Sequence, residues 1–204
     1  MDKFVVSVAD ASHIHYAEQI CDMIADSAEK RGTGIARRST EYVQGKLADG
    51  KSVIALTKSG KLAGFCYIET WGHGKYVANS GLIVNPDYRN NGLAQAIKAR
   101  AFKLSREKYP EAKLFGLTTS MAVMKINSDL GYRPVAFSEL TDDEAFWKGC
   151  SSCVNYDILT RKNHQHCLCT GMLYDPEEKK RKWKQRSKKV QEKLMMWKQK
   201  VQIK

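Results

Sequence analysis

The feature that most constrains the fold is an apolar strand that passes through a tight turn and a short loop directly into a helix. The strand ends at Leu82–Val84, the turn spans Asn85–Tyr88, and Gly92 precedes an apolar helical stripe that stops before Pro110. A helix N-terminus presents unpaired N–H groups and the positive end of the helix dipole, which together bind phosphate. Since Gly92 lets the backbone approach such a group closely, this junction predicts an anion-binding loop.

Hydrophobic periodicity predicts the elements around this junction. Strands are expected at residues 4–8, 52–57, 62–68, 77–84, 114–118, 132–137 and 154–159, and helices at 14–32, 40–47, 92–109 and 121–129. The second and third strands form a hairpin around a polar loop, and the later strands alternate with helices. This order predicts an α+β or α/β sandwich with a mixed sheet.

The net charge of +12 is distributed unevenly. Residues 176–204 carry 12 Lys and Arg against 3 Asp and Glu, whereas residues 1–175 carry 22 against 19. The basicity therefore says little about the chemistry of the core. No run of 18 apolar residues and no apolar leader occur, so we expect no membrane span, a cytoplasmic location and reduced cysteines.

The segment Arg89-Asn90-Asn91-Gly92-Leu93-Ala94 resembles the Arg/Gln-x-x-Gly-x-Gly/Ala signature of the GNAT superfamily of acyl-CoA-dependent N-acyltransferases. The resemblance covers about residues 4–160, and we expect a GNAT domain over residues 1–160. It implies a mostly antiparallel mixed sheet with a V-shaped splay between the fourth and fifth strands. It also implies that acetyl-CoA, or a larger acyl-CoA such as succinyl-CoA, binds at these six residues and along Leu82, Ile83 and Val84.

The implied reaction is attack of a neutral amine on a thioester, so the enzyme must remove a proton from an ammonium group and stabilise an oxyanion. Glu69, near the end of the hairpin strand, is the first candidate base, and His73 is the second. Many GNAT enzymes use a Tyr four residues before the late glycine to protonate the thiolate. Asn127 occupies that position here. Either Asn127 supports the sulfur by hydrogen bonding, or water supplies the proton.

A closer resemblance is to the acyltransferase domain of the N-acetylglutamate synthase family. It rests on residues 34–41, on 84–89, and on 114–119 followed by 131–135. It implies that Arg38, beside Ser39, binds a substrate carboxylate, with Thr118 and Thr119 nearby. An Arg guanidinium suits this role because it can pair with a carboxylate through two hydrogen bonds. Ser120 and Met121 stand where that family often has Arg-Ser.

The substrate class therefore has alternatives. The leading hypothesis is an enzyme that N-acylates glutamate or a similar amino acid in arginine biosynthesis. A GNAT enzyme acting on another amine, such as a polyamine, a peptide or a protein N-terminus, is the first alternative. A binding module for RNA or another anion, acting through the basic tail, is an alternative of a different class.

Cysteines gather near the C-terminal end of the core. Cys150 and Cys153 form one close pair, and Cys167 and Cys169 form another. Two pairs at this separation suit a tetrahedral Zn²⁺ held by thiolates, which would tie an extension at residues 161–175 to the core. The alternative is a loose cluster of free thiols.

The tail at residues 176–204 has the composition of a basic helix. Trp183, Val190, Leu194, Trp197 and Val201 are spaced by 7, 4, 3 and 4 residues, as in a narrow coiled-coil seam. Docking on its own domain or on a partner, including a homodimer, is the leading interpretation. Interleaved basic and Trp residues also fit binding to RNA, which we expect to be the less common use of such a helix.

Overall fold

The computed structural model describes residues 4–31, 38–178, 180, 181, 183–185, 187, 191 and 192. The chain divides into two compact units, Met1–Tyr174 and Asp175–Lys204. The first unit holds the sheet and all the residues expected to carry chemistry. Within the second unit, the described residues from 176 onward are helical, and Trp183 is 70% exposed. Val190, Leu194, Trp197 and Val201 of the expected seam lie outside the described residues.

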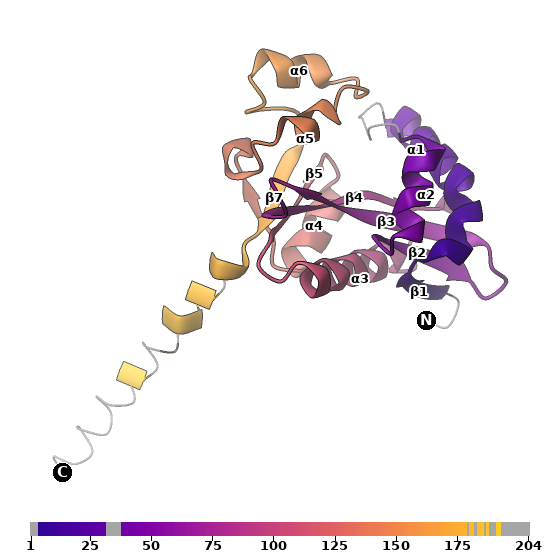
Figure 1. Ribbon diagram of the computed structural model, residues 1–204, viewed down its shortest axis with the longest axis horizontal. Coiled ribbons are helices and arrows are strands. Elements are labelled where there is room, and N and C mark those ends of the chain that lie inside the picture. Colours follow the sequence, from indigo (N-terminus) through magenta and orange to yellow (C-terminus); the bar gives the residue numbers. More distant parts are fainter. Residues whose placement is uncertain are drawn as a thin grey trace, which may run out of the picture. The chain divides into compact units, whose positions relative to one another are not determined.

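The first unit is a mixed α/β sandwich (Figure 1). Its strands are β1 Phe4–Val8, β2 Ser52–Thr57, β3 Leu62–Trp71, β4 Tyr76–Val84, β5 Lys113–Thr118, β6 Arg133–Val135 and β7 Thr170–Tyr174. Its helices are α1 Ala17–Arg31, α2 Thr40–Ala48, α3 Leu93–Lys108, α4 Met121–Asp129, α5 Glu144–Lys148 and α6 Tyr156–Arg161. Short 3-10 turns lie at Ala11–Tyr16, Pro86–Tyr88 and Phe137–Glu139.

The strands form a sheet with the order β1-β2-β3-β4-β5-β7-β6, in which only β4 and β5 are parallel neighbours. Helices α1 and α2 cover one face, and α3 covers the other (Figure 1). Because successive strand residues point to opposite faces, Val53 and Ala55 pack toward α3 while Ile54 packs toward α1 and α2. This alternation places an apolar core on each face of the sheet.

The sheet opens between β4 and β5. Their parallel pairing covers only three positions and ends at Ala78 opposite Phe115. The β3–β4 register shifts beside the pair formed by Tyr67 and Ser80, where Gly81 adopts a φ of +64°. A Cβ on Gly81 would lie 2.7 Å from the Tyr67 ring, so glycine alone fits this bulge. The predicted splay between the fourth and fifth strands is thereby confirmed.

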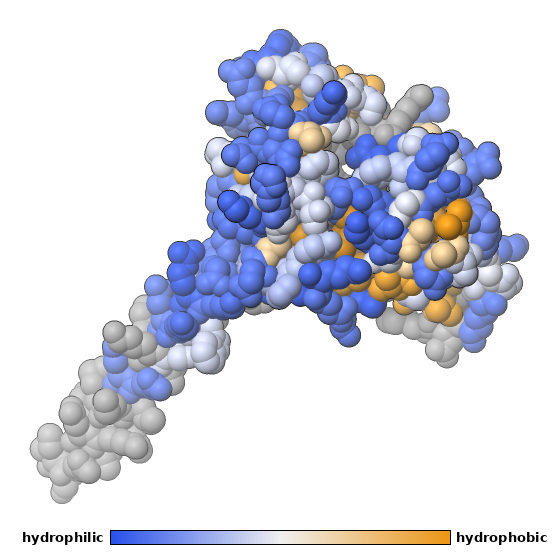
Figure 2. Space-filling view, in the orientation of Figure 1, coloured by the Kyte–Doolittle hydropathy of each residue, from blue (hydrophilic) through white to orange (hydrophobic). Residues whose placement is uncertain are grey.

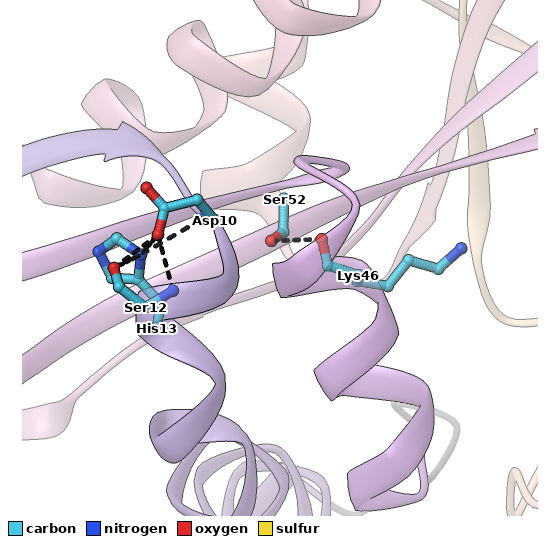
Figure 3. A network of polar contacts seen from close by, with 5 residues as sticks. All are labelled: Asp10, Ser12, His13, Lys46 and Ser52. Carbon is cyan, nitrogen blue, oxygen red and sulfur yellow. Dashed lines mark hydrogen bonds and ion pairs between the residues drawn. The ribbon is translucent and has the colours of Figure 1, made fainter.

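Local hydrogen bonds fix the N-terminal helices against the sheet (Figure 3). Asp10 and His13 form a reciprocal capping box at the first 3-10 turn. The Ser52 hydroxyl donates to the main-chain carbonyl of Lys46 at 3.0 Å, which ties the end of α2 to the start of β2. The Lys46 ammonium points away from this contact (Figure 3), so the side chain is available for another partner.

The C-terminal strand prediction was wrong. Residues 154–159 do not form a strand, since α6 begins at Tyr156 and Val154 is 71% exposed. Buried Leu159 and half-buried Tyr156 lie three residues apart, a spacing that suits a helix. The strand that completes the sheet is β7, which lies between β5 and β6 and antiparallel to both. The strand expected at 132–137 is shorter and gives way to a 3-10 turn at Phe137.

Hydrophilic residues cover most of the face drawn in Figure 2, and apolar residues appear there only in small patches. None of the helices in the described part of the chain is long and apolar enough to cross a membrane.

Candidate active site

A cavity of about 370 Å³ occupies the gap where β4 and β5 separate. Its wall includes Tyr67 and Glu69 of β3, residues 78–82 of β4, residues 115–118 of β5, Lys98 of α3 and Asn127 of α4. Tyr67 belongs to the core beneath α1 and α2, whereas Lys98 lies on the α3 side. The cavity therefore reaches groups on both faces of the sheet through the splay.

A charged cluster, which we call the carboxylate cluster, lies on the α2 side: Arg38, Tyr42, Tyr67 and Glu69, which line the cavity, and Lys46, which pairs with Glu69. The Tyr42 hydroxyl donates to Glu69 Oε2 at 2.6 Å, and the Lys46 ammonium pairs with the same oxygen. Lys46 also lies over the Tyr42 ring, 4.9 Å from its centroid. Burial, then Tyr67 and Glu69, raise the pKa of Tyr42 far above its ordinary value, so its hydroxyl remains a donor.

Arg38 reaches the same cluster from the segment before α2. Its Nε donates to the Tyr67 hydroxyl at 2.7 Å, and its guanidinium lies over the rings of Tyr42 and Tyr67. Although burial opposes the charged form, these tyrosines outweigh it and raise the pKa of Arg38. The guanidinium thus remains a cation on the wall of the cavity that Glu69 also lines.

On the α3 side the cavity holds a second group, which we call the splay cluster: Asn79, Lys98, Gly116 and Asn127. Lys98 is 2% exposed, and its Nζ donates to the Asn79 carbonyl at 3.5 Å. Asn79 also receives the Tyr132 hydroxyl and donates to Ser105 through its side chain. Asn127 is 1% exposed, and its Oδ1 has no hydrogen-bond partner among the described residues.

The loop before α3 leads into a helix start that has no side-chain cap. Asn90 and Gly92 adopt positive φ values of 62° and 70°, and α3 begins at Leu93 with no acidic residue in its first turn. Asn91 donates to the carbonyls of Tyr88 and Arg89, which holds the loop in place.

The nine residues expected to bind the cofactor fall into two groups. Arg89, Asn90, Asn91 and Gly92 are exposed, Leu82, Val84 and Ala94 are half-buried, and Ile83 and Leu93 are buried in the cores. Only Leu82 of the nine lines the cavity. The loop therefore offers its main-chain N–H groups outside the cavity, and β4 connects the loop to the cavity wall.

The fold places most of the expected catalytic and substrate-binding residues in the cavity and leaves two of them outside it. Glu69, Asn127 and Arg38 line the cavity, as do Thr118 and Thr119. Thr118 accepts a hydrogen bond from the Ser120 N–H. Ser39 is exposed and caps α2 by accepting the Tyr42 N–H. His73 is exposed in the turn between β3 and β4 and lies outside the cavity, beside a shallow pocket with Glu111 and Lys113.

The four clustered cysteines line the cavity on the segment between β6 and β7. Burial raises the pKa of Cys150 to about 11 and that of Cys169 to about 12, with a further contribution from the neighbouring thiols. No three His, Cys, Asp or Glu side chains in the described residues, which include all four cysteines, are arranged to hold a metal ion. The zinc site expected at Cys150, Cys153, Cys167 and Cys169 therefore finds no support.

Six residues of the two clusters were missed from the sequence: Tyr42, Lys46, Tyr67, Asn79, Lys98 and Gly116. Tyr42 and Lys46 stand four residues apart and therefore share one face of α2. Lys98 lies on the buried face of α3, between Ile97 and Ala101. A charged residue within an apolar helical stripe is a signal that could have identified it.

Comparison with known proteins identifies the family. The model of the acetyltransferase (GNAT) family matches residues 17–124, which is more than half of the chain. No curated protein matches the sequence.

Solved structures share the fold. N-acetylglutamate synthase from Neisseria gonorrhoeae, complexed with coenzyme A and N-acetyl-glutamate, has a TM-score of 0.60 and 17% identity over 84% of this chain. The match spans 35% of that chain, about a third of its length. Rv2747 from Mycobacterium tuberculosis, in complex with CoA and NLQ, has a TM-score of 0.59 and 18% identity, with 84% of this chain and 98% of that chain covered.

The diaminobutyrate acetyltransferase EctA from Paenibacillus lautus, in complex with L-2,4-diaminobutyric acid and coenzyme A, is also similar. Its TM-score is 0.57 at 10% identity, and 86% of this chain and 96% of that chain are covered. At such identities the likeness to these three structures shows the fold alone.

Proposed function

This chain belongs to the GNAT acetyltransferase family and is an acyl-CoA-dependent N-acyltransferase, and from that premise we propose that it acylates the α-amine of glutamate or a similar amino acid. The single observation that carries the substrate class is the position of Arg38. A guanidinium and the Glu69 carboxylate lie in one cavity, at the point where β4 and β5 part. Such a pair can hold a substrate carboxylate and receive a proton from its amine.

The proposed donor site follows from the loop and β4. The pyrophosphate of the acyl-CoA binds the N–H groups at the start of α3, with Arg89 adding positive charge. The pantetheine arm extends along Leu82–Val84, because β4 pairs with β5 only as far as Ala78. The thioester then lies in the splay, where a main-chain N–H of β4 stabilises the oxyanion.

The proposed acceptor site is the carboxylate cluster. Glu69 accepts the proton of the substrate ammonium, directly or through water, which leaves a lone pair for attack on the thioester. Lys46 and Tyr42 hold the Glu69 carboxylate in place through contacts with its Oε2. Arg38 binds the substrate carboxylate, and Thr118 and Thr119 complete the wall on the β5 side.

The ligands of two similar solved structures support this choice of substrate. One is complexed with coenzyme A and N-acetyl-glutamate, and another with a diamino acid and coenzyme A. Both ligands combine an amine-derived nitrogen with a carboxylate. A role in arginine biosynthesis belongs to the same proposal and follows from it if glutamate is the acceptor.

The test is thiol release from acetyl-CoA and succinyl-CoA with a panel of acceptors: glutamate, other amino acids, diamines, and a peptide with a free N-terminus. We expect turnover with glutamate or a close analogue. In Arg38→Met, KM for that acceptor should rise about 10- to 100-fold, because a charge-assisted hydrogen bond contributes ~1.5–3 kcal/mol. Turnover of diamines alone, unchanged in Arg38→Met, would refute the carboxylate-binding role and favour a polyamine-type acceptor.

A further inference from the structure

Lys98 is buried, but no ion pair with a described residue compensates its charge. Burying an ammonium group is unfavourable unless an anion or several hydrogen bonds compensate. The described contacts of Nζ are the Asn79 carbonyl at 3.5 Å and the Tyr132 ring, whose centroid lies 5.5 Å away. Neither carries a charge, and no carboxylate in the described residues forms a salt bridge with Lys98 within 4.0 Å.

The titratable groups that face Lys98 from neighbouring elements also stay neutral. Cys66 of β3 is fully buried, and desolvation raises the pKa of its thiol. Desolvation likewise raises the pKa of Tyr132 well above its ordinary value. The same desolvation lowers the pKa of Lys98, with a small opposing effect of Cys66. The ammonium of Lys98 therefore has a weakened hold on its proton.

The position of Lys98 explains what the group can do. Its carbonyl partner, Asn79, is the first residue of β4 beyond the last pair with β5. On the other strand, Nζ lies 4.0 Å from the point that a Cβ on Gly116 would occupy. Lys98 thus reaches the cavity at the origin of the splay. Asn127, with its unpartnered Oδ1, lies on the same cavity wall but has no acidic proton to give.

We propose that the ammonium of Lys98 protonates the sulfur of coenzyme A as the acyl group leaves, a role that rests on the proposed acyl transfer. The C–N bond forms as the C–S bond breaks, and the electron pair of the C–S bond moves to sulfur. A proton passes from Nζ to sulfur, which yields the coenzyme A thiol and neutral Lys98. Solvent returns a proton to Lys98 before the next turnover. Glu69 takes the two protons that the nitrogen loses, one before attack and one as the amide forms, and passes each of them to solvent.

The energetics favour a buried lysine in this role. A general acid is most effective when its pKa lies near that of the group it protonates and near the working pH. An ordinary lysine, at ~10.4, holds its proton more tightly than a thiolate at ~8.5 does. Because desolvation lowers the pKa of Lys98, proton transfer to sulfur becomes less uphill.

The first experiment compares Lys98→Met with the matched variant Lys103→Met, which removes an exposed lysine from the same helix. In Lys98→Met, we expect kcat to fall about 100-fold, in line with the typical contribution of a general acid. Affinity for coenzyme A should stay near that of the wild type. In the wild type, kcat should fall at alkaline pH as Lys98 loses its proton, and this alkaline limb of the pH profile should be absent in Lys98→Met. Lys103→Met should keep the wild-type rate and profile.

The second experiment needs no acceptor amine. Coenzyme A is bound to the protein, and formation of its thiolate is followed with pH by ultraviolet absorbance. In Lys98→Met, the midpoint should move to higher pH, because the variant lacks the cation that stabilises the thiolate. A merely structural lysine would leave this midpoint in place. The melting temperature of Lys98→Met should not fall, because Met removes a buried charge.

The outcomes separate this inference from the proposed function. If no acceptor in the panel is turned over but the thiol midpoint shifts as expected, the proposed substrate fails and the contact between Lys98 and sulfur stands. If the wild type is active while Lys98→Met keeps its kcat and its alkaline limb, the inference is overturned. It is equally overturned if Tyr156→Phe, which removes another cavity-lining hydroxyl, abolishes that limb instead.

Discussion

The buried lysines on the two sides of the cavity differ in their partners. On the α2 side, Lys46 is 8% exposed and pairs with Glu69, which also accepts the Tyr42 hydroxyl. On the α3 side, Lys98 is 2% exposed and meets only a carbonyl and an aromatic ring among the described residues. In the carboxylate cluster the Lys46 cation is paired with Glu69, whereas the Lys98 cation of the splay cluster has no charged partner among the described residues. Lys46 is thus held by a carboxylate of the protein, whereas the group that we infer Lys98 acts on belongs to the substrate.

The strongest effect should come from removing the Glu69 carboxylate on the α2 side. Glu69→Gln should lower kcat by about 10²- to 10⁴-fold, because it removes the proposed base. It also leaves Lys46 without its carboxylate, so the free energy of unfolding should fall by about 2 kcal/mol, below the cost of breaking a fully buried pair. Thiol release and denaturant unfolding measure the two effects.

The double variant Lys46→Met/Glu69→Gln is the control for this prediction. It should recover most of the lost stability, because both charges are gone, but none of the lost activity. Recovery of activity would show that Glu69 serves only as a partner for Lys46, and the comparison between the two sides would then lose its functional meaning.

The second largest effect should come from adding an anion on the α3 side. Ala94→Glu places a carboxylate in the first turn of α3, where it should weaken coenzyme A binding by about 2 kcal/mol, roughly 30-fold, through repulsion of the pyrophosphate. The same change should stabilise the free protein by ~0.3–1 kcal/mol through the helix dipole. Calorimetric titration measures the weaker binding of coenzyme A, and thermal unfolding measures the added stability of the free protein. Ala94→Gln is the neutral control.

A smaller effect should appear in the pH dependence of stability. The pKa of Lys98 is lowered in the folded state, so between that value and the ordinary ~10.4 the unfolded state binds more protons and stability rises with pH. The extra stability of Lys98→Met over the wild type should therefore be largest at neutral pH and shrink as the pH approaches that of an ordinary lysine. Urea unfolding over this range measures the difference. A constant gap between the two proteins would contradict the unbalanced charge.

The smallest effect should come from chelators. Since the described residues hold no arrangement of ligands for a metal ion, EDTA should leave the melting temperature unchanged. A fall of several degrees, reversed by zinc, would show that the four cysteines hold a metal ion and add a third charged group to the cavity wall.

The sequence predicted the parts of the fold that depend on local rules. The strand, turn and helix around Gly92 follow from periodicity and from a backbone conformation that glycine favours. The splay between β4 and β5 was expected only from the resemblance to a family, and the bulge at Gly81 was not predicted. The strand at Thr170–Tyr174 was missed, because its five residues show no alternation of burial and owe their pairing to β5 and β6.

The site was predictable only in part, because its contacts join residues far apart in the chain. Arg38 and Glu69 were chosen separately, and nothing in their spacing indicates that they share a cavity. The Tyr42–Glu69 and Lys46–Glu69 contacts depend on how α2 packs against β3, which periodicity does not specify. His73 was a reasonable candidate by residue type, but a turn that carries it away from the cavity cannot be read from composition.

The three-residue pairing between β4 and β5 has a consequence for how the sheet responds to its ligand. Strands β1–β4 and strands β5, β7 and β6 are joined by only three residue pairs, although one apolar core contains residues of both parts. A pantetheine arm laid along β4 would donate and accept hydrogen bonds beside those pairs, as a further strand would. Amide hydrogens of β4 and β5 at the splay should then exchange more slowly when coenzyme A is bound than when it is absent. In this protein the bound substrate would extend the short pairing that joins the two parts of the sheet.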